Sequence, residues 1–132
     1  MKILWQTEES TLGFDPSTCL LYFVRSNHRS SIEEINRFRI ELPILLGRAG
    51  LMINGLMIDM REVVGRNDDQ FEEASAKLLL DLTKFVPRIA VLVSSAAGRM
   101  QVQRHNRLFK IPIQGFSDES AALEFLQSGQ VR

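Results

Sequence analysis

Short hydrophobic runs separated by turn residues predict several β-strands along the chain. Residues 3–6 and 19–24 are rich in aromatic and branched side chains, and the stretch 13–17 between them has the glycine, aspartate and proline of a turn. This pattern predicts two antiparallel strands. The near-continuous apolar runs 56–60 and 89–93 are typical of strands covered on both faces, and predict the centre of a sheet.

A first helix is predicted after residue 31, where apolar positions recur at spacings of three and four. Ser31 and Glu34 form a capping-box pattern at its start. Pro43 lies inside the periodic segment, and its missing N–H and its ring predict a kink or an end of the regular helix near Glu41. The residues expected on the buried face are Ile32, Ile35, Phe38, Leu42 and Leu45.

Three further helices are predicted in the second half of the chain. Residues 67–69 offer caps for a second helix, and a short third helix begins at about Arg99. A brief edge strand at 113–116 precedes a last helix, which residues 117–118 cap and Gly129 ends. The second helix is expected to bury Phe71, Ala74, Leu78, Leu82 and Phe85, and the last helix Ala122, Leu123 and Leu126.

Strands that alternate with helices imply right-handed crossover connections and helices packed against a largely parallel sheet. The chain has 132 residues, an ordinary size for one domain, and contains no linker, repeat or low-complexity tract. We therefore expect a single α/β domain over residues 1–132, with a mixed sheet of about five strands and about four helices.

The charges of the chain balance, with 16 basic and 16 acidic side chains. No net field attracts nucleic acid over long range, and no nucleic-acid-binding motif is present. Cys19, His28 and His105 provide no disulfide, no metal-ligand spacing and no pairing of nucleophile and base. The start of the chain lacks the pattern of a signal peptide, and its apolar runs are too short to span a bilayer. We expect a cytoplasmic protein that is not an enzyme and uses no cofactor or metal.

Several strings of residues carry a family resemblance that covers most of the chain. They are residues 56–61, Gly65-Arg66-Asn67-Asp68 with Phe71-Glu72, Arg88-Ile89-Ala90-Val91, Gly98-Arg99-Met100-Gln101-Val102, and Phe116 with Asp118, Glu119, Ala121, Ala122 and Leu126. Together with the order of the elements, they resemble the SpoIIAA-like branch of the STAS superfamily, which shares its architecture with Sec14-type lipid carriers. The resemblance implies that fold and a small module that binds a partner or a ligand.

One segment departs from the family pattern. The better-known relatives are anti-sigma-factor antagonists that are switched by phosphorylation of a serine at the start of the helix after the central strand. Here that segment reads Asp59-Met60-Arg61-Glu62-Val63-Val64-Gly65, without serine or threonine. We therefore expect the fold and a general binding role, without the phosphoserine switch.

Polar and charged residues follow the two central strands. Ligands of open α/β sheets sit beyond the carboxyl ends of parallel strands, which would bring Asp59 and Arg61 towards Ser94 and Ser95. The helix that follows would offer free backbone N–H groups to a phosphate or carboxylate, with Arg99 adding a full charge. The same residues are also explained by a serine that caps this helix and by an ion pair between Asp59 and Arg61.

Two neighbouring segments are further candidates for recognition. Arg66 and Asn67 lie in the loop 63–70, which is either a recognition segment or only the start of a helix. Residues 99–110 contain four arginine or lysine side chains and no acid, whereas residues 67–81 contain five acids and one lysine. The basic segment could meet an acidic protein surface, a lipid headgroup or, less favoured without a binding motif, a nucleic-acid backbone, or it could be a solvated helix face.

Two functions are compatible with these features. The first is a regulatory module for protein–protein interaction, with its contact surface around residues 59–67 and the adjoining helix. The alternative is a carrier or sensor of a small apolar or anionic ligand, in the manner of Sec14-like lipid binding. It is motivated by an excess of apolar residues in the stretch 43–53, which core packing also explains. A homodimer is compatible with either function.

Overall fold

Six strands and their connecting helices form three layers. The computed structural model describes residues 1–27, 31–49, 52–63, 69–96, 98, 100, 102–103 and 110–128. Its elements, in chain order, are β1 (Lys2–Gln6), β2 (Ser10–Asp15), β3 (Leu20–Arg25), α1 (Ile32–Ala49), β4 (Gly55–Asp59), α2 (Asp69–Leu82), β5 (Ile89–Leu92), β6 (Ile113–Phe116) and α4 (Glu119–Gln127).

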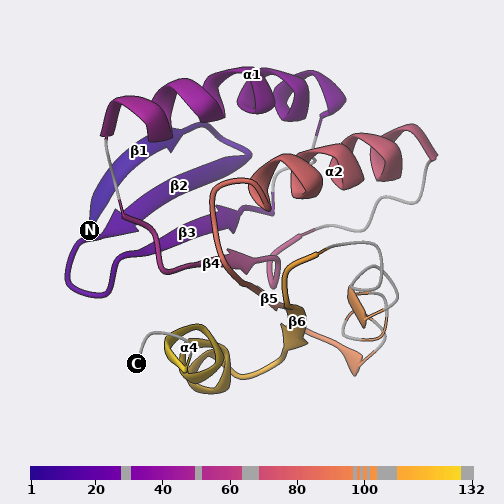
Figure 1. The fold of residues 1–132 in the computed structure, drawn as a ribbon. Helices are drawn as coiled ribbons and strands as arrows, with labels where there is room; N and C mark the ends of the chain where they lie inside the picture. The colour runs from indigo at the N-terminus through magenta and orange to yellow at the C-terminus, as the bar shows by residue number, and fades with distance from the viewer. Residues whose placement is uncertain are drawn as a thin grey trace.

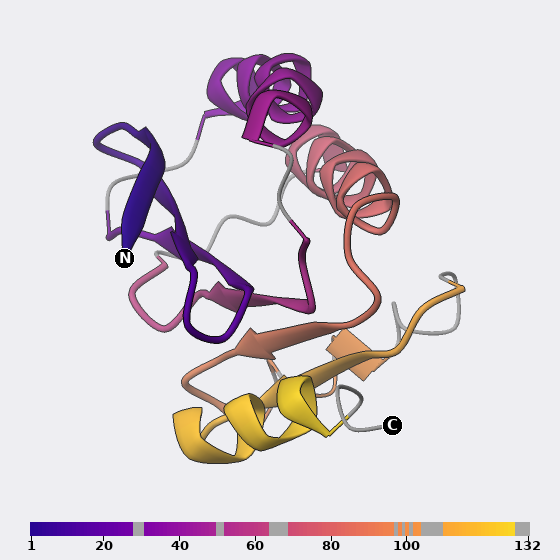
Figure 2. The same cartoon turned by 60° about the vertical axis from the view of Figure 1, so that its left-hand side comes forward.

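The strands lie in the sheet in the order in which they follow one another in the sequence. β1, β2 and β3 pair antiparallel, whereas β3 to β6 pair parallel. α1 and α2 lie on one face of this sheet and α4 lies on the other (Figure 1 and Figure 2). The predicted α/β fold with a mixed sheet is confirmed, with six strands in place of about five.

The strand that the sequence analysis missed is β2. The prediction that residues 3–6 and 19–24 pair with each other is wrong, because both flank β2 and do not touch as neighbours in the sheet. Gly13 was interpreted as part of a turn, but it lies inside β2 beneath Met1. A Cβ atom at Gly13 would come within 2.6 Å of the sulfur of Met1, so glycine permits a close approach here.

Pro43 does not end α1, which continues to Ala49. The proline removes one backbone hydrogen bond from the helix interior. Pro43 is exposed, whereas Leu42 and Leu46 are buried in the main core. Burial of these neighbours holds the helix against the sheet, and the predicted end near Glu41 is wrong for this reason.

Ser31, just before α1, and Glu9, in the turn between β1 and β2, hold the start of α1. Ser31 Oγ accepts a hydrogen bond from the backbone N–H of Glu34 at 3.2 Å, as the capping-box pattern predicts. The backbone N–H of Ser31 donates at 2.6 Å to a carboxylate oxygen of Glu9, and Ser31 Oγ donates to the other oxygen at 2.9 Å. Glu9 therefore fastens the turn between β1 and β2 to the helix.

The later elements lie close to their predicted positions. β5 and β6 fall within the predicted strand segments, and β4 begins one residue before its predicted run, at Gly55. Asp118 caps α4 by accepting a hydrogen bond from the backbone N–H of Ser120 at 3.2 Å. The described residues between 96 and 103 are helical, in agreement with a third helix. The predicted capping residues 67 and 68 and the predicted stop at Gly129 lie outside the described residues.

Two hydrophobic cores hold the layers together. The larger lies between the sheet and the helices α1 and α2. In it the ring of Phe38 stacks on the ring of Phe23, with 4.9 Å between the ring centroids, and is tilted against the ring of Trp5, with 5.5 Å between the centroids. The smaller lies under α4 and consists of Leu20, Met57, Ala90, Leu92, Ala122 and Leu126. Among the described helices, none combines the length and the apolar character that a membrane span requires.

Candidate functional site

An arginine and an aspartate are joined at the carboxyl end of β4. Asp59 is the last residue of the strand, and Arg61 lies in the turn that follows. The guanidinium of Arg61 donates from Nε to Asp59 Oδ1 at 3.1 Å and from Nη2 to Oδ2 at 2.8 Å. The backbone N–H of Arg61 also donates to Oδ1 at 3.1 Å, so both carboxylate oxygens are engaged.

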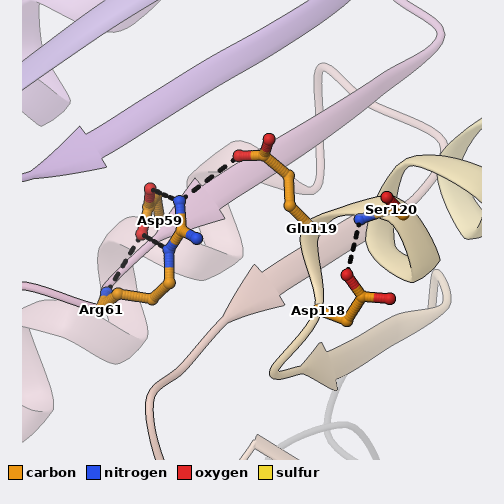
Figure 3. Close-up of polar contacts among 5 residues, drawn as sticks. All are labelled: Asp59, Arg61, Asp118, Glu119 and Ser120. Carbon is orange, nitrogen blue, oxygen red and sulfur yellow. Dashed lines mark hydrogen bonds and ion pairs between the residues drawn. The ribbon is translucent and has the colours of Figure 1, made fainter.

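Glu119 extends this pair to the last helix. Nη2 of Arg61 also donates to Glu119 Oε1 at 3.3 Å, and Glu119 is the first residue of α4 (Figure 3). The preceding residue, Asp118, instead accepts a hydrogen bond from the backbone N–H of Ser120 (Figure 3). Arg61 therefore connects the end of the central strand to the start of the helix on the second face of the sheet.

Asp59 and Arg61 stabilise each other's charged form. The hydrogen bond from the Arg61 side chain lowers the pKa of Asp59 below its ordinary value, although burial opposes the shift. The same contact raises the pKa of Arg61. Both groups stay ionised at neutral pH, and Asp59, with its oxygens occupied, is poorly suited to accept a proton from a substrate.

Ser94 and Ser95 lie after β5, exposed at the same end of the sheet. Ser95 Oγ accepts a hydrogen bond from the backbone N–H of Gly98 at 3.1 Å, which caps the helical turn that follows. The structure thus contains both the helix cap and the ion pair of the simpler interpretation. Ligand binding by these residues stays a prediction.

Three predicted site residues cannot be placed beside this cluster. Arg66, Asn67 and Arg99 lie outside the described residues. Glu119 was not predicted as a partner of Arg61. Its position in the first turn of a predicted helix was visible, but a contact across 58 positions leaves no local pattern in the sequence.

The segments that follow β5 and β6 pack on opposite faces of the sheet. Val102 and Ile111, from the segment between β5 and β6, pack against the core shared by α1 and α2. α4, which follows β6, packs on the opposite face. The chain therefore leaves β5 and β6 towards opposite faces, while the order of the strands in the sheet does not reverse.

The apolar stretch that motivates a carrier function is used for packing in part. Leu46 is buried in the main core, and Ile53 packs against it, whereas Ile44 and Met52 are exposed. A shallow, open hollow lies elsewhere, on the outer surface of α4, between Ser120, Leu123, Glu124, Gln127 and Ser128. Within the described part of the chain, no His, Cys, Asp and Glu side chains are grouped to hold a metal ion.

Comparison with solved structures shows the class of fold. No family model matches the sequence, and no curated protein shows significant similarity to it. The structure is similar to an uncharacterised protein of the DUF3478 family from Shewanella loihica PV-4, which has a SpoIIAA-like fold. The identity is 20%, the TM-score is 0.71, and the match covers 92% of this chain and 97% of the other. The chain therefore has the SpoIIAA-like fold that its sequence resembles.

Proposed function

We propose that this protein is a non-catalytic binding or regulatory module that acts by contact with another protein, without the usual phosphoserine switch. Its contact surface is the arginine edge, which we define as Asp59, Arg61 and Glu119 at the carboxyl end of β4 and the start of α4. The observation that carries the proposal is the anchored but exposed guanidinium of Arg61.

The geometry of Arg61 suits protein recognition. Its side chain is 41% exposed although two carboxylates hold it, so a partner would meet an arginine whose conformation is already fixed. Fixing a long side chain in advance lowers the entropy cost of association. Arginine is also enriched among the residues that dominate binding energies at protein interfaces.

The surrounding sequence supports a switch-free role. Residues 60–68 contain no hydroxyl side chain that a kinase could modify. A phosphate added near this edge would also lie beside Asp59, Glu62 and Glu119, where like charges repel. A constitutive contact surface is therefore favoured over one that phosphorylation controls at this position.

Affinity capture from the native cell with an Arg61→Ala variant tests the proposal. We expect the variant to lose the proteins that the wild-type chain retains, because truncation removes the fixed guanidinium and releases two carboxylates. The matched control is Arg39→Ala, which breaks another arginine–aspartate pair, Arg39 with Asp81 at 2.7 Å, on the α1 and α2 side.

The comparison of the two variants decides the outcome. Retention of every partner by Arg61→Ala, with circular dichroism showing an intact fold, would contradict the arginine edge as the contact surface. Loss of the same partners by Arg39→Ala would point to a general effect on stability instead.

A further inference from the structure

The face of the sheet that carries α4 is covered over only part of its width. One row of paired residues crosses this face from β1 to β5 and contains Ile3, Gly13, Tyr22, Met57 and Ala90. Met57 and Ala90, under α4, are buried, whereas Ile3 is 51% exposed and Tyr22 is only partly buried. Apolar surface is thus left open where the row crosses β1 to β3.

The next row shows the same division. Val24 of β3 pairs with Asp59 of β4, which in turn pairs with Leu92 of β5. Leu92 is fully buried by α4, whereas Val24 is 40% exposed. We call the surface formed by Met1, Ile3, Tyr22 and Val24 the open half of the sheet.

The opposite face shows what a complete layer looks like. There α1 packs over the first strands through Phe38, which contacts Trp5 of β1 and Phe23 of β3, and α2 lies alongside it (Figure 2). On the second face α4 occupies the place beside β4 to β6 and has no neighbouring helix among the described elements. Tyr22 packs against the core under α4 and marks the border of the open half. Within the part of the chain that the structure describes, the open half therefore lacks a counterpart of α1.

The border of the open half is acidic. Glu119 and Asp15 both lie close enough to raise the pKa of Tyr22, although burial is the larger cause. Asp59 and Glu62 lie around Arg61 at the carboxyl end, and Arg61 is already shared by two carboxylates. The amino group of Met1 is near Asp15 and offsets part of this charge at the other end.

We propose that the partner docks an amphipathic helix, with lysine or arginine beside its apolar stripe, on the open half of the sheet alongside α4. This inference rests on the proposed function and names the chemistry of the partner. An apolar helix face in a complementary groove is a recurring mode of peptide recognition, and basic residues on its border would meet the exposed carboxylate of Glu119, which Arg61 holds in position.

A second copy of the chain fits this surface less well. The open half consists of four side chains, whereas a stable dimer interface uses roughly 20 residues on each side. Two copies facing each other would also bring their acidic borders together. The size suits a single docked segment.

Site-specific photo-crosslinking in the native cell tests the inference. A photoreactive amino acid replaces Val24 in the open half or, as the matched control, Leu80, an exposed leucine of α2 on the opposite face. We expect position 24, and not position 80, to crosslink to a partner segment that has helical apolar periodicity and an excess of lysine and arginine.

A peptide synthesised from the crosslinked segment then gives the quantitative readout. We expect its affinity to fall at least about tenfold for Val24→Asp and for Ile3→Asp, because a buried unpaired charge opposes docking, and to stay unchanged for Leu80→Asp. Two variants on different strands keep the test valid if one of them is unstable in thermal unfolding.

Other results overturn the inference in distinguishable ways. Crosslinks from position 24 to a second copy, or to an extended or acidic segment, would contradict the basic helix. Partners whose capture depends on Arg61 but that never crosslink to position 24 would refute the docking surface and leave the proposed function standing. If Arg61→Ala captures the same proteins as the wild type, the proposed function itself fails.

Discussion

Asp59 receives three hydrogen bonds from one neighbour, Arg61, and this sets its acid–base behaviour. A carboxyl group whose pKa is lower in the folded than in the unfolded protein stabilises the fold above its unfolded pKa, about 3.9. That contribution is lost as the pH falls through the lower, folded pKa. Local stability at the arginine edge therefore depends on ionisation in the acid range.

We expect Asp59→Asn to lower the free energy of unfolding near neutral pH by less than about 1 kcal/mol, because the arginine is partly solvated. The difference from the wild type should shrink as the pH falls from about 5 through the lowered pKa of Asp59. Urea unfolding across this range measures it. A matched control is Glu62→Gln, which removes an equal charge nearby without disturbing the Asp59 carboxylate. A difference for Asp59→Asn that does not change with pH would contradict the assignment.

At the level of elements, α4 depends on a glycine in the strand below it. A Cβ atom at Gly55, the first residue of β4, would lie 3.0 Å from Leu126 of α4 and 3.2 Å from Leu20 of β3. Contacts this short force neighbouring side chains or the helix to shift. Gly55 therefore allows α4 to lie close against the sheet.

Gly55→Ala is expected to lower the free energy of unfolding by about 1–3 kcal/mol through overpacking. The matched control, Gly47→Ala, lies in α1 with open space around the new methyl group, and should raise it by about 0.5–1 kcal/mol through helix propensity. Urea denaturation with both variants gives the two values. Equal effects of the same sign would show that α4 does not constrain Gly55.

The elements also show how far sequence patterns reach. β4, β5, α2 and α4 could be predicted because apolar periodicity and capping residues are local signals, and burial on folding follows them. β2 could not be predicted, because Gly13 looks like a turn residue in the sequence. Only the structure shows that it lies in a strand with Met1 packed above it. The continuation of α1 through Pro43 depends on the burial of Leu42 and Leu46 against the sheet. Helix propensity is a property of single residues and does not include this tertiary contact.

The candidate site was predictable to the same extent. The pairing of Asp59 with Arg61 follows from two residues next to a strand end, and it was one of the two interpretations that the sequence offered. The helix cap at Ser95 is similarly local. Glu119 joins the cluster only through the packing of α4 on the sheet, and the open half of the sheet depends on where that helix lies. Both require the three-dimensional arrangement.

For the molecule as a whole, the cores leave little reason to expect a resident ligand. Leu46, in the stretch that motivates a carrier function, is buried between α1 and the sheet, and Ile53 packs against the same core. Native mass spectrometry of the purified protein should therefore give the mass of the chain without a retained small molecule, and it reports the oligomeric state in the same spectrum. An added non-covalent mass of lipid size, absent from the denatured protein, would favour the carrier function instead.

The order of strands in the sheet has a consequence for the growing chain. Each strand from β2 to β6 pairs with the strand synthesised just before it, so every strand leaving the ribosome finds its neighbour already present. The antiparallel pairs β1–β2 and β2–β3 need only short connections to close, whereas each parallel pair from β3 to β6 must first close a long crossover. α4 is the exception, since it reaches back across β4, β5 and β6 from the end of the chain. Closure of the second face therefore waits for the last helix, and until then the whole of that face is available to a chaperone or a partner.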